Sequence, residues 1–214
     1  MKGRVLDLGR RGYGEVWELQ NQLVLTRARE SCPDTLILVE HEHVITLGRK
    51  TSSENFRPQS IPVFQVERGG DATYHGPGQL VGYPILKLQD HDVHRYLRML
   101  EEVLIGTTKS YGIASERIQG HTGVWVGSKK IASIGVAVSG WVTYHGFALN
   151  VSPDLTYFRR IRPCGLDPDT ITSMNEVLKR PVEMRGVKER AIEEFSSVFG
   201  MELIATTIES PLPK

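Results

Sequence analysis

The feature that most constrains this chain is a glycine-rich stretch at residues 68–79, with the sequence RGGDATYHGPGQ. Four glycines and a proline within twelve residues do not suit an ordinary core helix or strand. Apolar runs at 61–66 and 80–86 flank the stretch and are typical of strands. Glycine lets a ligand approach the main chain, and Arg68 and Thr73 place a charge and a hydroxyl beside the N–H donors. The pattern predicts a ligand-binding loop between two strands, with a purely structural turn as the alternative.

Length and charge narrow the class of protein. The 214 residues suit one domain, which we expect to span residues 1–214. Because 26 basic residues balance 25 acidic ones, the chain lacks the excess positive charge of an electrostatic nucleic-acid binder. The first residues carry no apolar run of signal-peptide length, and no window approaches about 18 consecutive apolar residues. We therefore expect a cytoplasmic protein that binds neither nucleic acid nor membrane.

Periodicity along the chain predicts strands mixed with separate helices. Helical spacing of apolar residues marks 13–28, 91–111 and 183–199, and 155–161 is predicted as a short helix. Strand patterns fall at 5–8, 34–40, 44–47, 61–66, 80–86, 123–126, 130–138 and 142–151. The last three of these strands follow one another through short turns, as in a meander. The order predicts an α+β domain rather than a strictly alternating α/β one.

Cys164 is a candidate nucleophile. It lies between proline and glycine in a turn sequence, next to Arg159, Arg160 and Arg162, whose charges favour thiolate over thiol. The alternative is a buried, inert cysteine, although such residues usually have apolar neighbours. The same arginines could dock an acidic partner or simply form a solvated face. Cys32 precedes a proline at a helix exit and is interpreted as an inert free thiol.

Lys130 is a second candidate. Strand alternation turns Lys129 and Lys130 to opposite faces, so one of them can be partly buried. Burial lowers the pKa of a lysine toward the range that suits proton transfer. From the residues alone, a solvated turn lysine is the simpler interpretation, because unpaired lysines are rarely buried.

The histidines do not form a recognised metal motif. The chain lacks His-Glu-x-x-His and the cysteine pairs of zinc sites, so we expect no metal. His41 and His43 are expected in a loop and His75 in the binding site. His145 is expected in a strand, either as a hydrogen-bonded sheet histidine or beside space for an apolar ligand at residues 146–148. The glycine-rich stretch also lacks Gly-Lys-Ser/Thr and Gly-x-Gly-x-x-Gly, so a nucleotide site is not indicated.

Four blocks in this order resemble the octanoyltransferases of lipoate biosynthesis: residues 68–79, KIASIG at 130–135, HGFALN at 145–150, and PCG at 163–165. The resemblance implies a biotin/lipoate protein ligase-like α+β fold, with a mixed, mostly antiparallel sheet and flanking helices. It implies a thioester acyl-enzyme on Cys164 with Lys130 as its partner. The implied substrate-binding residues are Arg68, Gly69, Gly70, Asp71, Ala72, Thr73, Tyr74, His75, Ser133, Ile134, Gly135, Gly146, Phe147 and Ala148. Ser133 stands where the family often has alanine, and Asp71 and Ala72 occupy variable positions.

The implied activity moves an octanoyl group from octanoyl-acyl carrier protein to a lysine of a lipoyl domain. The acceptors would be lipoyl domains of 2-oxoacid dehydrogenases and the glycine cleavage H protein, and the enzyme would be a monomer without a cofactor. Tyr74, Ile134 and Phe147 are candidates for an apolar acyl channel. Two alternatives remain, namely an ATP-dependent lipoate or biotin ligase, which needs no nucleophilic cysteine, and a non-catalytic acyl-binding module.

Overall fold

The computed structural model describes residues 2–51, 60–161 and 170–206. Within these residues, an eight-stranded sheet has the order β11-β1-β2-β6-β10-β9-β8-β7, and a three-stranded sheet has the order β4-β3-β5. The large sheet consists of β1 (Lys2–Arg11), β2 (Asp34–His41), β6 (Gln79–Ile85), β7 (Glu116–Ile118), β8 (His121–Val126), β9 (Lys129–Ser139), β10 (Val142–Asn150) and β11 (Glu202–Ala205). The small sheet consists of β3 (Val44–Leu47), β4 (Val63–Gln65) and β5 (Thr73–His75). The helices are α1 (Tyr13–Ala28), α2 (Val93–Lys109), α3 (Met174–Leu178), α4 (Met184–Phe199) and the 3-10 helix η2 (Leu155–Arg160).

The large sheet is mixed. β1 pairs in parallel with β2 and β11, whereas the pairs from β2 through β6, β10, β9 and β8 to β7 are antiparallel. The predicted meander is confirmed, because β8, β9 and β10 are consecutive antiparallel neighbours. The predicted α+β class is therefore confirmed as well.

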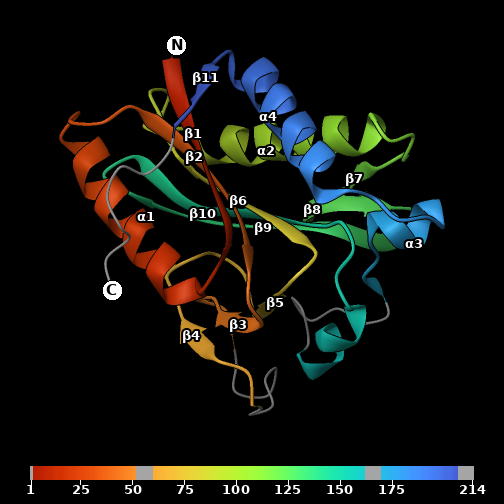
Figure 1. Ribbon diagram of the computed structural model, residues 1–214. Helices are drawn as coiled ribbons and strands as arrows, with labels where there is room; N and C mark the ends of the chain where they lie inside the picture. The colour runs from red at the N-terminus through yellow and green to blue at the C-terminus, as the bar shows by residue number, and fades with distance from the viewer. Residues whose placement is uncertain (1, 52–59, 162–169, 207–214) are drawn as a thin grey trace.

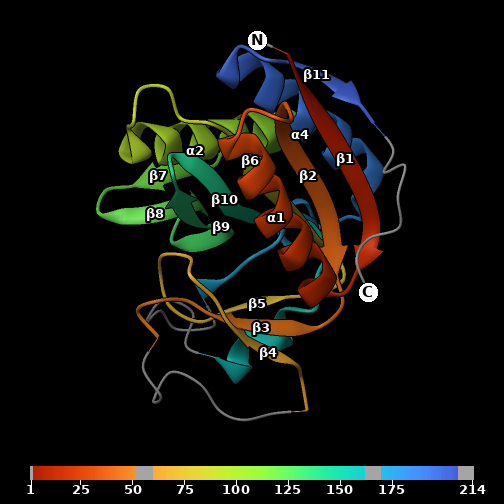
Figure 2. The same cartoon turned by 90° about the vertical axis from the view of Figure 1, so that its left-hand side faces the viewer.

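Helices cover both faces of the large sheet. α1 lies against one face, and α2 and α4 lie together on the other (Figures 1 and 2). Leu100, Leu104 and Phe195 belong to the core under α2 and α4, which we call the α2 core. Val16 and Ile37 belong to the core under α1, which we call the α1 core. The two faces of one sheet thus carry separate apolar cores, as strand alternation requires.

The small sheet lies at one end of the large one, beside η2 (Figure 2). Its central strand β3 pairs in parallel with β4 and antiparallel with β5. The expectation that the whole stretch 68–79 is a loop is wrong for Thr73–His75, which forms β5. The pairing of Val44 with His75 explains this difference, since a partner strand distant in sequence supplies the ladder.

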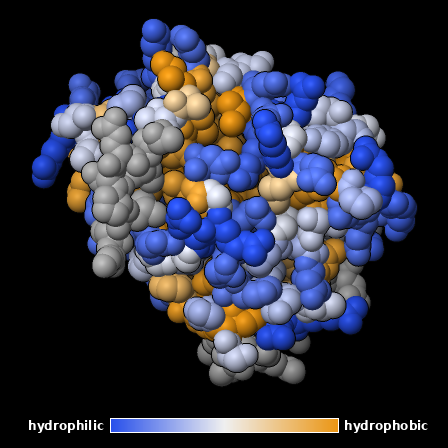
Figure 3. Space-filling view, viewed as in Figure 1, coloured by the Kyte–Doolittle hydropathy of each residue, from blue (hydrophilic) through white to orange (hydrophobic). Residues whose placement is uncertain are grey.

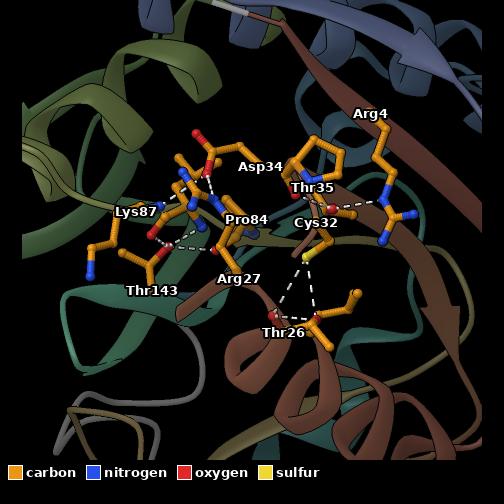
Figure 4. A network of polar contacts seen from close by, with 12 residues as sticks. Arg4, Thr26, Arg27, Cys32, Asp34, Thr35, Pro84, Lys87 and Thr143 are labelled. Carbon is orange, nitrogen blue, oxygen red and sulfur yellow. Dashed lines mark hydrogen bonds and ion pairs between the residues drawn. The ribbon is translucent and has the colours of Figure 1, made fainter. Parts of the chain in front are cut away.

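Asp34 connects the end of α1 to the segment that follows β6 (Figure 4). One carboxylate oxygen accepts from Arg27 Nε at 2.6 Å and from the main-chain N–H of Lys87 at 3.0 Å. Nearby, the sulfur of Cys32 lies 3.3 Å from the hydroxyl of Thr26. Cys32 is thus a half-buried thiol with a local partner, which fits the interpretation of an inert residue.

The surface mixes polar and apolar residues. On the face in Figure 3, blue polar side chains predominate and orange apolar ones lie between them. Across residues 2–51, 60–161 and 170–206, no helix combines the length and the apolar character needed to cross a bilayer.

Candidate active site

A cavity of about 410 Å³ brings together most of the residues that the resemblance singled out. Its size is within the range of small-molecule sites. The predicted residues that line it are Arg68, Gly69, Gly70, Thr73, His75, Lys130, Ser133, Ile134, Gly135, Gly146, Phe147 and Ala148. Two of the three candidates for the acyl channel, Ile134 and Phe147, are among them. Segments that are far apart in sequence therefore form one chamber.

Three of the predicted residues lie outside this lining, namely Asp71, Ala72 and Tyr74. Tyr74 instead lies in the apolar cluster beside η2, with its ring 5.1 Å from that of Tyr157. Its hydroxyl lies 2.8 Å from Nδ1 of His43. The structure therefore places Tyr74 behind the site rather than in it.

Lys130 is buried, with 6% of its surface exposed, whereas Lys129 is exposed. The alternation predicted for this pair is confirmed, and the solvated-turn interpretation of Lys130 is wrong. Its ammonium lies 5.1 Å from the centre of the Trp125 ring, which stands opposite it on β8. A cation over a Trp face is stabilised by the ring quadrupole, so a buried lysine has a partner here that sequence reasoning did not identify.

Glycine at position 123 makes room for the Lys130 side chain. A Cβ at Gly123 would lie 2.5 Å from Cε of Lys130, and the φ of +130° there disfavours other residues. On the other side, the main-chain N–H of Thr172 donates to the carbonyl of Lys130 at 2.9 Å. The position of Lys130 is therefore fixed from both neighbouring segments.

Arg68 anchors the glycine-rich stretch to β3. Its guanidinium donates to the carbonyl of Thr46 at 2.7 Å and to the hydroxyl of Thr46 at 3.0 Å. The next residue, Gly69, donates its N–H to the carbonyl of Val136 on β9 at 2.9 Å. Hydrogen bonds to β3 and to β9 hold this wall of the cavity in place, so the binding loop has a preformed shape.

Two histidines of the site, His75 and His145, are neutral near pH 7. Burial lowers the pKa of His145 to about 4, the Arg68 guanidinium lowers it further, and the Glu67 carboxylate opposes both. Burial, followed by the charges of His41 and Arg68, holds the pKa of His75 well below its usual range. Positive charge beside these two histidines therefore comes from Arg68 rather than from their imidazole rings.

His145 has a strained backbone. Its φ is +54° inside β10, a region that residues other than glycine rarely occupy. The side-chain oxygen of Gln20 accepts the N–H of His145 at 2.8 Å, so α1 stabilises this conformation. Nε2 of His145 makes no hydrogen bond within the described residues and lies 3.6 Å from the Glu67 carboxylate. Of the two interpretations of His145, the hydrogen-bonded sheet histidine does not hold for its Nε2 atom, and His145 lines the cavity together with residues 146–148.

A line of buried amides connects the glycine-rich stretch to Lys130. Nδ1 of His75 lies 3.2 Å from Oε1 of Gln79, and Nε2 of Gln79 donates to Oδ1 of Asn150 at 3.0 Å. Nδ2 of Asn150 then donates to the carbonyl of Thr172 at 3.0 Å, and the N–H of Thr172 reaches Lys130. Gln79 and Asn150 lie inside the blocks 68–79 and 145–150, but the sequence analysis did not select either side chain for the site.

Other lining residues were missed because they lie outside the four blocks. They are Tyr13, Lys50, Tyr83, Val93, Leu97, Gly120, His121, Thr122 and Val136. Tyr13 and Tyr83 come from predicted elements of the α1 side, and Val93 and Leu97 come from the first turns of α2. Their sequence patterns mark them as core or surface, and the tertiary arrangement alone brings them to the cavity.

Cys164 and Arg162 lie outside the described residues. Ile161 and Ile171, which precede and follow the undescribed stretch, both pack in the cluster that contains Tyr74. Arg160 lies over the ring of Tyr157, 4.7 Å from its centre, and Arg159 is also engaged. The docking role of these arginines stays a prediction. Among the described residues, no three His, Cys, Asp or Glu side chains gather in a way that could hold a metal ion.

Together with comparisons with known proteins, the fold and the cavity define the class of protein to which this chain belongs. A family model for the lipoyl protein ligase A/B catalytic domain matches residues 12–196, so the chain belongs to that family. A curated relative named octanoyltransferase, from Syntrophotalea carbinolica, is 50% identical over 196 residues, which cover 91% of this chain and 93% of the relative. The resemblance to octanoyltransferases predicted from the four sequence blocks is therefore confirmed.

Solved structures agree on the fold. The bipartite lipoate protein ligase of Thermoplasma acidophilum superposes with a TM-score of 0.77 at 19% identity, covering 97% of this chain and 88% of that one. The biotin protein ligase of Aquifex aeolicus gives a TM-score of 0.52 at 12% identity, covering 94% and 70% of the two chains. The predicted biotin/lipoate protein ligase-like fold is confirmed.

Proposed function

We propose that this protein transfers an octanoyl group from octanoyl-acyl carrier protein to the lysine of a lipoyl domain, with Cys164 as nucleophile and Lys130 as its partner. The acceptors are lipoyl domains of 2-oxoacid dehydrogenases and the glycine cleavage H protein, and the reaction takes place in the cytoplasm. The name shared by its relatives supports the octanoyl transfer. The name of the Thermoplasma acidophilum system, a ligase and its E2 lipoyl domain, supports the class of acceptor.

The observation that carries the proposal is the burial of Lys130 in the same cavity as the glycine-rich wall. A buried lysine needs a function or a partner, because burial of an ammonium is costly. Cys164 is three residues after Ile161 and eight before Thr172, and Thr172 is bonded to Lys130. These two described residues flank the stretch that contains Cys164, and the contact of Thr172 with Lys130 supports the pairing of Cys164 with Lys130 that we propose.

The proposed first step is a thioester exchange. The Cys164 thiolate attacks the carbonyl carbon of the octanoyl thioester, a C–S bond to Cys164 forms, and the bond to the pantetheine sulfur breaks. The departing thiolate takes a proton from the Lys130 ammonium, which until then has favoured the thiolate form of Cys164. One thioester replaces another, so this step is close to neutral in energy.

The proposed second step forms the amide. The lysine amine of the acceptor attacks the Cys164 thioester, a C–N bond forms, and Cys164 leaves as a thiolate. The amine gives one proton to the neutral Lys130, so the ammonium and thiolate pair is restored. An amide is more stable than a thioester, so the step runs downhill and needs no ATP. Backbone N–H groups beside the site would stabilise the oxyanion of both tetrahedral intermediates.

Intact mass measurement tests the proposal. The protein is incubated with octanoyl-acyl carrier protein without ATP, and we expect a gain of one octanoyl group on the wild type. We expect no adduct on Cys164→Ser. Lys130→Met, which keeps the length of the side chain and removes the ammonium, should acylate at least about 100-fold more slowly, the usual loss for a general acid–base group.

Three outcomes would contradict the proposal. Transfer that proceeds only with ATP would indicate an ATP-dependent lipoate or biotin protein ligase, the class of enzyme whose fold this protein shares. An octanoyl adduct that persists on Cys164→Ser would remove Cys164 as the nucleophile. A non-catalytic acyl-binding module would bind octanoate without a covalent product.

A further inference from the structure

β8 and β9 separate inside the cavity and form a fork. Their pairing ends with Val124 opposite Ala132, and continuing the same register would place Thr122 opposite Ile134. That pair is absent from the ladder of the described strands. Instead, Thr122 and Ile134 both line the cavity, one from each arm of the fork. The cavity therefore extends into a gap in the sheet.

Glu101 of α2 holds the β8 arm in place. Its side chain is fully buried, and Oε1 accepts the main-chain N–H of Gly123 at 3.1 Å. Oε2 accepts from Arg98 at 2.6 Å and from Arg117 at 3.0 Å. The Gly123 amide that Glu101 binds is next to Val124, where the two arms diverge, so side-chain contacts of the fold support the fork.

The main chain of Ile134 faces this gap. In an antiparallel ladder, alternate residues direct both N–H and C=O to the same side. The carbonyl of Val136 accepts from Gly69, on the side away from β10, and His145, the β10 partner of Val136, gives its own N–H to Gln20. Ile134 is two residues from Val136 and so points the same way. Its N–H and C=O are directed into the fork, where β8 no longer pairs with them.

The fork lies on the side of the α2 core. Ile134, Val93 and Leu97 pack against that core, whereas Tyr13, Tyr83 and Ala148, which line the other part of the cavity, belong to the α1 core or pack with it. The lining of the one cavity thus includes residues from the cores of both faces of the sheet, together with Lys130 and Arg68. One thioester donor has two extended arms, an acyl tail and a carrier arm, and each requires a channel.

We propose that the fork binds the pantetheine arm of the donor, whose amides hydrogen-bond to the main chain of Ile134 in the manner of an added strand. This inference rests on the octanoyl transfer proposed above. A narrow arm with two secondary amides can pair with one residue of free edge and cover the apolar walls with its methylene groups. A peptide strand of an acceptor fits less well, because the edge is closed by the Val124–Ala132 pair at one end and by Gly69 at the other.

The test compares thioester donors that differ only in the arm. The donors are S-octanoylpantetheine, S-octanoyl-N-acetylcysteamine, which keeps one amide, and S-octanoyl ethanethiol, which has none. The measured quantity is kcat/KM for acylation of the intact protein, followed by mass. We expect each amide that is removed to lower kcat/KM about fivefold, the effect of one net hydrogen bond.

Two variants narrow the fork from different walls. Leu97→Trp acts from α2, and Thr122→Trp acts from the exposed β8 arm, where folding is least affected. Each should lower kcat/KM for S-octanoylpantetheine roughly tenfold and change that for S-octanoyl ethanethiol less than about twofold. Leu25→Trp is the matched control, because Leu25 is 61% exposed on α1 and away from the cavity, and it should behave as wild type with all three donors.

Equal losses with both donors in the two fork variants would overturn the inference. A shift in preference toward shorter acyl chains would also overturn it, because the fork would then hold the acyl tail. If the wild type is acylated by none of the three donors nor by octanoyl-acyl carrier protein, the octanoyl transfer itself fails. That result is distinct from either outcome for the fork.

Discussion

Acidification should destabilise this protein through His41. Nδ1 of His41 lies 3.0 Å from the carbonyl oxygen of Arg11, and Nε2 lies 2.8 Å from the hydroxyl of Tyr83. A carbonyl can only accept, so Nδ1 carries the hydrogen and Nε2 accepts from Tyr83. A proton added at Nε2 would break that arrangement inside the core. Burial accordingly lowers the pKa of His41 to about 4, although the bond to Arg11 acts in the other direction.

The size of the effect follows from linkage. In the unfolded chain a histidine has a pKa of about 6.5. Between pH 6.5 and pH 4 the unfolded chain therefore binds a proton that the folded chain does not, and the free energy of unfolding falls as the pH falls. The contribution is fully present above pH 6.5 and stops decreasing below pH 4. For a shift of this size, going from pH 7 to pH 5 removes about 2 kcal/mol.

Urea denaturation of wild type and His41→Asn at pH 7 and pH 5 measures this contribution. The Asn amide keeps a donor for the carbonyl of Arg11 and has no titration in this range. The variant should be less stable at pH 7, since Tyr83 loses its acceptor, but its loss between pH 7 and pH 5 should be smaller by about 2 kcal/mol. Equal pH dependence in wild type and His41→Asn would refute the reasoning.

Two further substitutions test how the cavity is built. Gly146→Ala should lower the free energy of unfolding by about 2 kcal/mol or more in urea denaturation, because its Cβ would lie 2.1 Å from the Gly82 carbonyl; unchanged stability would contradict this. Asn150→Ala should lower stability by about 2 kcal/mol and slow acylation, since Gln79 and Thr172 both lose a buried partner. Asn150→Asp keeps the acceptor for Gln79 but not the donor for Thr172, so it should not restore the acylation rate. A wild-type rate in Asn150→Ala would show that the amide line does not position Lys130.

The elements that the sequence predicts well are those with a strong local pattern. The helix predicted at 13–28 has the bounds of α1, and that predicted at 183–199 differs from α4 by one residue. The short strands were harder to predict from the sequence. β5, β7 and β11 were not predicted, because each is three or four residues long and exists through a partner distant in sequence. His41, expected in a loop, ends β2 for the same reason, as it pairs with Arg11.

The same distinction between local patterns and long-range pairing separates the site features that the sequence predicts from those that it does not. Glycine, proline and alternation are local signals. They predicted a binding loop that begins at Arg68, which lines the cavity, and opposite faces for Lys129 and Lys130, which the burial of the pair confirms. The partner of Lys130 was not readable, because Trp125 stands opposite it only in the observed register, which shifts between Val124 and Trp125. A sequence pattern marks which residues can carry chemistry, and a register shift decides which of them become buried neighbours.

The fork depends on contacts that no local pattern contains. Glu101 has the helical spacing of an exposed residue next to Arg98, yet it is fully buried and bonded to an amide 22 residues further along the chain. Two arginines that remain partly exposed compensate its buried charge, and the bond to Gly123 directs the carboxylate to the strand. The bond from Glu101 to Gly123 fixes the β8 arm at the point where the β8–β9 ladder of the described residues ends, beside Val124 and Ala132. Beyond that point Thr122 and Ile134 line the cavity from the two arms, so the shape of this part of the cavity depends on a contact 22 residues apart in sequence.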